Sequence, residues 1–340
     1  MAEKLDWDDI SLVPETISYI DSRSEINIYD KYGNLPLFTA PMDMVIDETN
    51  SDIFRENKIN VCLPRGVKSK NENDFISFGL DEIIEKVENN EELPKRVLID
   101  IANGHMKKLM DISKTIKEKY DVELMVGNIA NPRTYLEYAK IGVDFIRCSI
   151  GSGAGCTTSA NGAVHYPAAS LINECFKIKE ASNFKTKIVA DGGFKKFPDI
   201  IKALALGADY VMLGGIFNKA LESCSPCFLK SNGIKGIEYR KIDLDTAKLH
   251  LERGDIVYKY YRGMSTKEVQ RDWGVSESNL RTSEGISFYN EVEYTLDGWL
   301  DNFSSYLKSA MSYTNSKNLE LFKGVEFIVI SQNAFNRFNK

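Results

Sequence analysis

The chain has 340 residues, of which 43% are hydrophobic, and it carries a formal net charge of −6. This length suits one large α/β domain or two average domains, and the acidic balance argues against a nucleic-acid-binding protein, which would show a basic stripe. No apolar run reaches the roughly 20 residues that span a bilayer, and the acidic N-terminus is unlike a signal peptide, so we expect a cytoplasmic protein with reduced cysteines.

Short β-type runs alternate with segments of helical spacing from residue 35 onward. The runs cover residues 35–40, 60–63, 75–78, 96–102, 123–127, 145–150, 187–190 and 210–213. Between them lie stretches such as 106–119 and 198–206, whose apolar residues recur at helical spacing. Strands that alternate with helices form a parallel sheet with right-handed crossovers. Eight such units predict a (β/α)8 TIM barrel, an α/β fold.

Polar residues and glycines follow the predicted strands, which is where a barrel places its chemistry. They read PMD at 41–43, PRG at 64–66, NGH at 103–105, Asn128 and DGG at 191–193, with a second Gly-Gly pair at 214–215. Each Gly-Gly pair alone is also compatible with a tight turn between a strand and a helix. Because both follow the last two strands, together they predict a phosphate cradle built from backbone N–H groups.

The loop after the sixth predicted strand is rich in glycine and carries a cysteine. It reads GSGAGCTT over residues 151–158. Glycine lets such a backbone adopt positive φ and approach a ligand closely, and a thiol at the end of a strand suits a nucleophile. Taken alone, the loop also fits an ordinary glycine-rich turn with a half-buried cysteine.

The chain changes character after the eighth predicted strand. Residues 224–257 are charged and lack strong periodicity, and we interpret them as a flap or finger. An amphipathic helix is predicted over residues 296–311. We expect residues 1–340 to form a single TIM-barrel domain, in which residues 224–295 supply the flap and the mobile catalytic segments. Cys224 and Cys227 lack a second CxxC pair and are interpreted as incidental thiols.

Nine short motifs lie in order at the mouths of the predicted strands. They are WDDISLVP (7–14), APMD (40–43), DIANG (100–104), GN (127–128), GSGAGCTT (151–158), ADGG (190–193), GADYVMLGG (207–215), YRGM (261–264) and SEG (283–285). On these motifs the chain resembles the IMP dehydrogenase / GMP reductase family over nearly its whole length. The short connection between the second and fourth strands leaves no room for an inserted regulatory domain. That feature, the short segment after Met264, and Glu174-Cys175 after Tyr166-Pro167 make the chain look like the reductase branch.

This resemblance implies reductive deamination of GMP by NADPH, which yields IMP and ammonia. Cys156 matches the family nucleophile, which attacks C2 of the purine and forms a covalent thioimidate. Thr158 and Glu284 match the pair that handles the departing ammonia.

The same resemblance assigns binding roles. Asp191 would hold the ribose hydroxyls, and the other substrate residues would be Gly193, Gly214, Gly215, Tyr261, Met264, Ser265, Arg281 and Gly285. Asp100 and Asn128 would face the nicotinamide ribose, and Arg65 is the candidate to meet a cofactor phosphate. Backbone carbonyls of Gly151, Gly153 and Cys156 match a monovalent-cation site, so K⁺ is a candidate cofactor beside NADPH.

Departures from the family pattern at Ala154, Ser159 and residues 63–66 keep three alternatives open. These are an IMP dehydrogenase, a reductase acting on a deoxy or modified guanylate, and a purine-nucleotide-binding barrel without turnover. His105 and His165 are interpreted as packing or solvent-facing residues.

Because barrels of this family are tetramers, we expect a homotetramer with no nucleic-acid or membrane partner. The apolar side chains of the last helix, Phe303, Tyr306, Leu307 and Met311, would then pack across a subunit boundary. The other arrangement open to them is to fold back on their own barrel.

Overall fold

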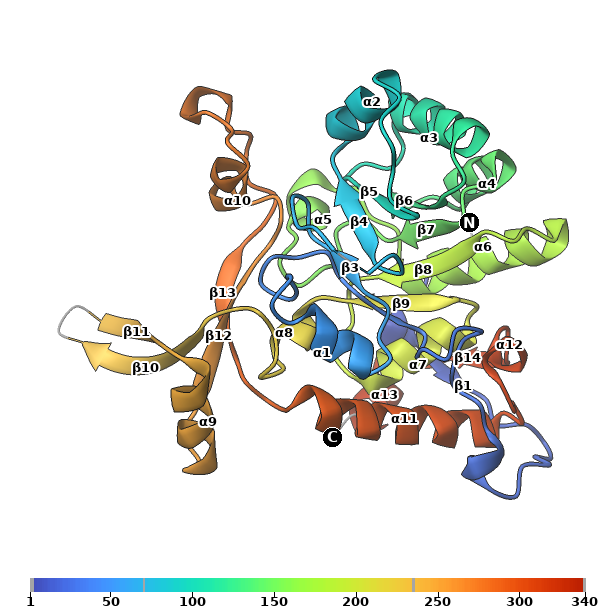
Figure 1. Cartoon of the computed structure of the whole chain (residues 1–340). Coiled ribbons are helices and arrows are strands. Elements are labelled where there is room, and N and C mark those ends of the chain that lie inside the picture. Colours follow the sequence, from blue (N-terminus) through green and yellow to red (C-terminus); the bar gives the residue numbers. More distant parts are fainter. Residues whose placement is uncertain (1–2, 70, 234–235, 339–340) are drawn as a thin grey trace.

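A computed structural model describes residues 3–69, 71–233 and 236–338, and its centre is an eight-stranded parallel sheet (Figure 1). The strands, in chain order, are β2 (Leu37–Thr39), β3 (Cys62–Leu63), β4 (Phe75–Phe78), β5 (Arg96–Asp100), β6 (Glu123–Ile129), β7 (Phe145–Cys148), β8 (Lys187–Asp191) and β9 (Tyr210–Leu213). The two ends of the sheet meet where Phe38 pairs with Asn60, whose N–H donates to the Leu37 carbonyl at 3.0 Å. The predicted TIM barrel is confirmed.

Helices follow most of the strands. They are α1 (Ser51–Glu56), α2 (Leu80–Glu88), α3 (Lys107–Lys119), α4 (Pro132–Ile141), α5 (Thr158–Gly162), α6 (Ala168–Ser182), α7 (Phe197–Ala205) and α8 (Gly215–Asn218). Helix α4 shows how the sequence sets their limits: Asn131 caps the first turn by accepting from Arg133 N–H, Pro132 opens the helix, and Gly142 ends it. Within the described residues, no helix is both long and apolar enough to cross a membrane.

Side chains that alternate inward along the strands fill the barrel. Phe38, Phe75, Phe145 and Tyr210 pack edge-to-face or tilted against one another, with ring centroids 4.9 to 6.0 Å apart. Because strand side chains alternate with period two, the inward residue after Phe145 is Arg147. The barrel is therefore apolar inside and becomes charged toward the carboxyl ends of the strands.

The segment after the barrel is an ordered finger. Strands β10 (Cys227–Gly233), β11 (Gly236–Ile242), β12 (Val257–Arg262) and β13 (Ser287–Glu291) form an antiparallel sheet in the order β11-β10-β12-β13. With α9 (Leu244–Glu252), this sheet projects away from the barrel (Figure 1). The finger expected after the last barrel strand is therefore an antiparallel sheet, a structure that the weak periodicity of residues 224–257 did not predict. Both faces of the hairpin carry apolar side chains, since Tyr239 stacks on Tyr289 at 3.7 Å and Cys227 packs with Ala247 behind them, so no alternation was visible.

Short elements join the finger and the chain ends to the barrel. After β12 come α10 (Lys267–Asp272) and the 3₁₀ turn Glu277–Asn279. Two further 3₁₀ turns lie near the N-terminus at Trp7–Asp9 and Arg23–Glu25. Strand β1 (Ile10–Leu12) pairs antiparallel with β14 (Phe327–Val329). In the chain, β14 lies between α12 (Leu319–Phe322) and α13 (Gln332–Phe338). An N-terminal segment and a C-terminal segment therefore pair with each other beside the barrel.

The predicted amphipathic helix is α11 (Leu296–Tyr313), and it lies along its own barrel (Figure 1). Phe303, Leu307 and Met311 are 0% exposed within the single chain. Tyr306 stays half exposed, with its ring centroid 5.2 Å from that of Phe197 on α7. The prediction that these side chains pack across a subunit boundary is therefore wrong for Phe303, Leu307 and Met311, which the chain itself buries, and stays a prediction for Tyr306.

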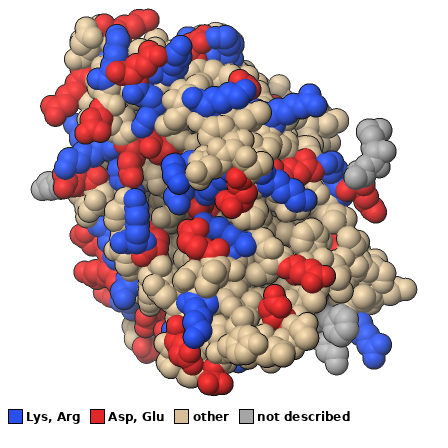
Figure 2. All heavy atoms as spheres, turned by 90° about the vertical axis from the view of Figure 1, so that its right-hand side faces the viewer, with Lys and Arg blue, Asp and Glu red and all other residues tan. Residues whose placement is uncertain are grey.

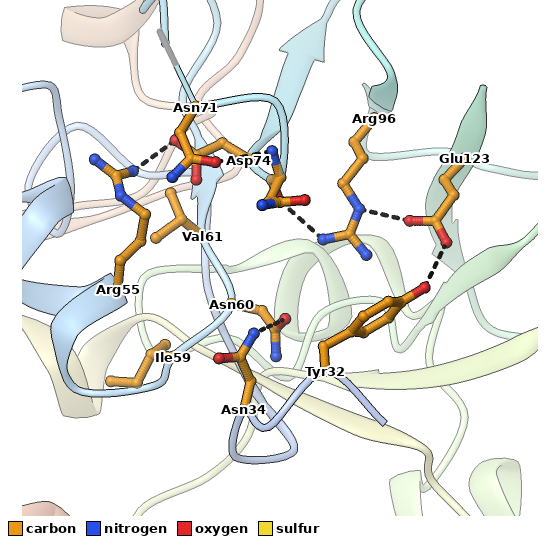
Figure 3. A pocket seen from close by; sticks show the side chains of 11 residues that line it. Tyr32, Asn34, Arg55, Ile59, Asn60, Val61, Asn71, Asp74, Arg96 and Glu123 are labelled. Atoms are coloured by element: carbon orange, nitrogen blue, oxygen red, sulfur yellow. Dashed lines mark hydrogen bonds and ion pairs between the residues drawn. The ribbon is translucent and has the colours of Figure 1, made fainter. Parts of the chain in front are cut away.

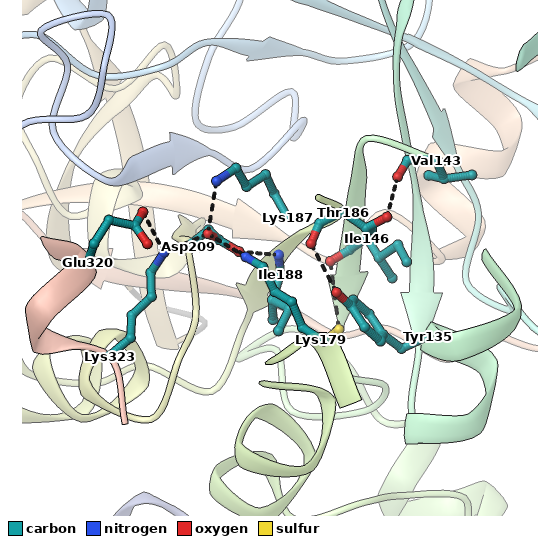
Figure 4. Close-up of polar contacts among 11 residues, drawn as sticks. Tyr135, Val143, Ile146, Lys179, Thr186, Lys187, Ile188, Asp209, Glu320 and Lys323 are labelled. Atoms are coloured by element: carbon teal, nitrogen blue, oxygen red, sulfur yellow. Dashed lines mark hydrogen bonds and ion pairs between the residues drawn. The ribbon is translucent and has the colours of Figure 1, made fainter. Parts of the chain in front are cut away.

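A charged cluster joins the C-terminal segment to the barrel (Figure 4). The buried Asp209 carboxylate accepts from Lys179 at 2.6 Å and from Lys323 at 2.7 Å, and Lys187 lies at 3.3 Å. Burial alone would raise the pKa of Asp209, but the three lysines lower it to about 2.

On the face that Figure 2 shows, Lys and Arg are interspersed with Asp and Glu, and no patch of a single sign stands out.

Candidate active site

The cysteine loop runs from the end of β7 and is completed by a distant segment of the chain. Cys156 is half-buried, and its N–H donates to the Gly153 carbonyl at 2.9 Å. Cys156 pairs as an antiparallel bridge with Gly285, and Thr157 N–H donates to the Glu284 carbonyl at 2.8 Å. The segment around Glu284 is therefore held against the loop by backbone hydrogen bonds.

Two consecutive hydrogen bonds between side chains link the three predicted catalytic residues. The Cys156 thiol donates to Thr158 Oγ1 at 3.3 Å, and Thr158 Oγ1 donates to Glu284 Oε2 at 2.6 Å. Thr158 and Glu284 are 126 residues apart in sequence. The arrangement places a carboxylate base one hydroxyl away from a thiol, which is a geometry for moving a proton from sulfur toward a carboxylate.

A small cavity of about 80 Å³ lies between the loops that follow β7, β8 and β9 and strand β12. Its lining includes the predicted residues Gly153, Asp191, Gly193, Gly214, Gly215 and Tyr261, together with Ala154, Gly192 and Phe194. Gly193 has φ +83°, a conformation that side-chain-bearing residues rarely adopt. The Tyr261 hydroxyl contacts Met42 Sδ at 3.4 Å, and burial raises its pKa, so it remains a neutral donor. The structure therefore brings these predicted residues together around one cavity.

One guanidinium joins the residues predicted for the substrate and for the cofactor. Arg147 Nη1 donates to Asp100 Oδ1 at 2.5 Å, and Arg147 Nε donates to Asp191 Oδ2 at 2.9 Å. Asn128 Nδ2 donates to the same Asp191 oxygen at 2.7 Å. Burial alone would lower the pKa of Arg147, but the two carboxylates raise it, so the group is charged. Sequence reasoning missed Arg147, which stands inside an otherwise apolar strand.

Arg65 lies at the edge of this network. Its Nε is 3.7 Å from Asp100 Oδ2, and its Cζ is 4.7 Å from the ring centroid of Trp273, at the end of α10. Among the described residues, Arg65 Nε is buried and has no hydrogen-bond partner. A cation with unused hydrogen-bonding capacity beside Asp100 fits the predicted contact with a cofactor.

The segment after β12 carries three further predicted substrate residues, Met264, Ser265 and Arg281, which differ in how far they are buried. Met264 and Ser265 are half-buried, and the Ser265 carbonyl accepts from Gln270 Nε2 at 3.2 Å. The Arg281 side chain is exposed, and its backbone N–H donates to Gln270 Oε1 at 2.9 Å. Within the described part of the chain, the Arg281 side chain forms no hydrogen bond or ion pair with another predicted site residue.

A second missed residue, Arg262, anchors this segment. The buried Arg262 guanidinium pairs with Asp43 after β2, with Glu268 at 3.0 Å and with Asp272 at 2.7 Å. Three acids from two segments around one arginine fix α10 over the barrel mouth. Asp43 belongs to the APMD motif, whereas Glu268 and Asp272 appear in the sequence only as scattered charges.

Comparison with known proteins supplies the family. A sequence model of the IMP dehydrogenase / GMP reductase domain matches residues 81–338, which is well over half of the chain. The chain belongs to the IMP dehydrogenase / GMP reductase family. It is 34% identical over 247 residues to the inosine-5'-monophosphate dehydrogenase of Chlorobaculum parvum, which covers 69% of this chain and 45% of that protein.

Two GMP reductases of the family align over nearly their whole length. The GMP reductase of Staphylococcus epidermidis is 27% identical, covering 97% of this chain and 98% of that protein. The GMP reductase of Lactobacillus delbrueckii subsp. bulgaricus is 29% identical, covering 98% and 97%. The chain thus spans less than half of the dehydrogenase but almost all of the two reductases.

Other residues of this family member hold the loops in place. His105 Nε2 accepts from Ala130 N–H at 3.0 Å, and Nδ1 lies 2.9 Å from Thr134 Oγ1. Burial lowers the pKa of His105, so its ring is a neutral packing residue, as expected. Ser159 Oγ donates to the Gly151 carbonyl at 2.8 Å, so one departure from the family pattern closes the cysteine loop.

The carbonyls predicted to hold a monovalent cation take part in this loop. Gly151 O accepts from Ser159, and Gly153 O accepts from Cys156 N–H at 2.9 Å. A carbonyl oxygen has two lone pairs, so each retains one for another partner. Neutral oxygens of this kind suit K⁺.

A larger cavity, of about 390 Å³, lies at the opposite end of the barrel (Figure 3). Its lining precedes β2, β3 and β4 or opens β5 and β6, and its charges are paired with each other. Arg55 binds Asp74 at 2.6 Å, and Arg96 binds Glu123 at 2.5 Å. It contains none of the predicted site residues, and barrels carry chemistry at the other face, so the smaller cavity is the candidate active site.

Proposed function

We propose that this protein is a GMP reductase, which converts GMP and NADPH to IMP, ammonia and NADP⁺. The observation that carries the proposal is the Cys156–Thr158–Glu284 hydrogen-bond chain at the edge of the glycine-lined cavity. A binding protein would need the cradle but not a thiol joined through a hydroxyl to a carboxylate.

Each residue then has a chemical task. The Cys156 thiolate adds to C2 of the purine, and the thiol proton passes through Thr158 and Glu284 to the 2-amino group, which leaves as ammonia. The resulting thioimidate remains bound to Cys156. Bound NADPH supplies the hydride that C2 receives, and Cys156 departs to leave IMP.

The flanking residues position the reactants. The glycines of the cradle and Tyr261 bind the 5′-phosphate, and Asp191 binds the ribose hydroxyls. Asp100, Asn128 and Arg65 would hold NADPH, since their polar atoms face the same network. The two relatives named GMP reductase align with nearly the whole chain, which supports the reductase over its alternatives.

Substitution of the nucleophile tests the proposal. A Cys156→Ala variant should oxidise NADPH in the presence of GMP at least about a thousandfold more slowly, because no covalent adduct forms. Loss of NADPH absorbance measures this. Cys224→Ala is the matched control, since that thiol contacts the Asp43 carbonyl instead. Undiminished turnover by Cys156→Ala would refute the nucleophile.

The 34% identity to a dehydrogenase keeps oxidation of IMP by NAD as the second candidate. Formation of XMP from IMP and NAD, without reduction of GMP, would select it. Comparable kcat/KM for dGMP and GMP would point to a deoxy or modified guanylate, since a ribose grip by Asp191 requires the 2′-hydroxyl. Tight GMP binding without product would select a barrel that has lost turnover.

A further inference from the structure

We propose that Arg147 is a positioning residue shared by the nucleotide half and the cofactor half of the site, so that one side chain sets the affinity for both ligands. The inference rests on the proposed function, because that function assigns Asp191 to the nucleotide and Asp100 to the cofactor. Arg147 contacts both carboxylates directly.

Each carboxylate is fixed through one oxygen. Asp191 Oδ2 accepts from Arg147 and Asn128, and within the described residues Asp191 Oδ1 has no hydrogen bond. Asp100 Oδ1 accepts from Arg147, while Asp100 Oδ2 lies 3.7 Å from Arg65. Arg147 therefore orients both acids and leaves one oxygen of each for a ribose hydroxyl.

The barrel is built to accept this guanidinium. Arg147 has 8% of its side chain exposed, and its charge is matched by two carboxylates whose side chains are 15% and 11% exposed. On the neighbouring strand, a Cβ at Gly127 would lie 2.4 Å from Arg147 Cβ, so only glycine leaves room there. A buried, bidentate arginine does not exchange freely for another residue, because its planar fork reaches two acids at once.

A purely structural ion pair predicts a different outcome. If Arg147 only filled the barrel, a methionine of similar length would preserve both ligand sites. If it positions the acids, its removal leaves two adjacent carboxylates that repel each other and turn away from the ligands.

Calorimetry separates these outcomes without turnover, with GMP alone and NADP⁺ alone as probes. Arg147→Met should weaken each ligand by about tenfold or more, while Arg147→Lys should recover part of both affinities because its charge remains. Lys179→Met is the matched control: it removes another buried cation, bound to Asp209, and should leave both affinities unchanged.

Wild-type affinities in Arg147→Met, or a loss confined to one ligand, would overturn the inference while the proposed function stands. Should Arg147→Met fail to fold, Arg147→Lys decides: losses at both sites support the shared role, and a loss at one or neither refutes it. A wild-type protein that binds neither probe would overturn the proposed function, and the inference with it.

Discussion

Thr158 connects the sulfur of Cys156, two residues before it, with the carboxylate of Glu284, 126 residues after it. Its hydroxyl accepts from Cys156 and donates to Glu284 at 2.6 Å. The hydroxyl can pass the thiol proton onward only if the Glu284 carboxylate can accept it. The activity therefore depends on the charge of Glu284.

Glu284→Gln should therefore lower kcat by about 100-fold or more and change the KM for GMP little, because the amide preserves shape but cannot take the proton. Steady-state kinetics measures both constants. Glu277→Gln is the control, as this exposed acid of the same segment pairs with Arg271 and not with the cysteine loop in the part of the chain that the structure describes. Equal kcat values for Glu284→Gln and the control would contradict the relay.

At the residue scale, the sequence indicated most of the site but not its internal contacts. The glycine and cysteine motifs follow strands, and strand ends converge in a barrel, so the meeting of Gly193, Gly214 and Cys156 was predictable. Arg147 was not recognised as a site residue, because a single charged residue inside an apolar run does not change the prediction of a strand. The period-two alternation from Phe145 would have placed it inward at the mouth.

Among the secondary-structure elements, the barrel strands were predictable because they are buried on both faces and therefore form short apolar runs, and α11 because its apolar residues recur at helical spacing. The strands of the finger were not predictable, since they carry apolar residues on both faces and form an exposed sheet. Its fold depends on contacts with β12 and β13, which come from later in the chain. Tertiary pairing of this kind leaves no local pattern.

The Asp209 cluster predicts how the C-terminal segment responds to acid. The folded pKa of about 2 lies below the unfolded value of about 3.9, so the folded state binds fewer protons and Asp209 contributes stability above about pH 4. That contribution, on the order of 2 kcal/mol, should disappear as pH falls toward about 2.

Asp209→Asn tests this directly. The substitution leaves three lysines without their carboxylate and should lower the free energy of unfolding at pH 7 by about 3 kcal/mol. Urea unfolding at several pH values measures it, and the variant should lose less stability between about pH 4 and about pH 2 than the wild type. An exposed acid, Asp245→Asn, is the control. If the free energy of unfolding fell equally in the variant and the wild type between about pH 4 and about pH 2, protonation of Asp209 would not explain the loss of stability.

For the whole molecule, we propose a homotetramer whose activity depends on K⁺. Helix α11 buries its apolar face on its own barrel, so the subunit contacts must use other surfaces. Exposed apolar side chains at Ile17, Tyr19 and Tyr313 lie where the N-terminal segment meets the end of α11.

Light scattering should give a mass near four chains, and activity should rise when K⁺ replaces choline in the buffer, because carbonyls of the cysteine loop would bind it. A variant that combines Ile17→Glu and Tyr313→Glu should form an assembly of lower mass without unfolding the barrel. A fully active monomer that ignores K⁺ would contradict both proposals.

The path of the hydride is a direct test of reductive deamination. With NADPH deuterated at the transferred position, the protein should convert GMP to IMP that carries deuterium at C2, with one ammonia released for each NADPH oxidised. Mass spectrometry of the nucleotide measures this. Unlabelled IMP, or XMP formed instead, would contradict reductive deamination through Cys156.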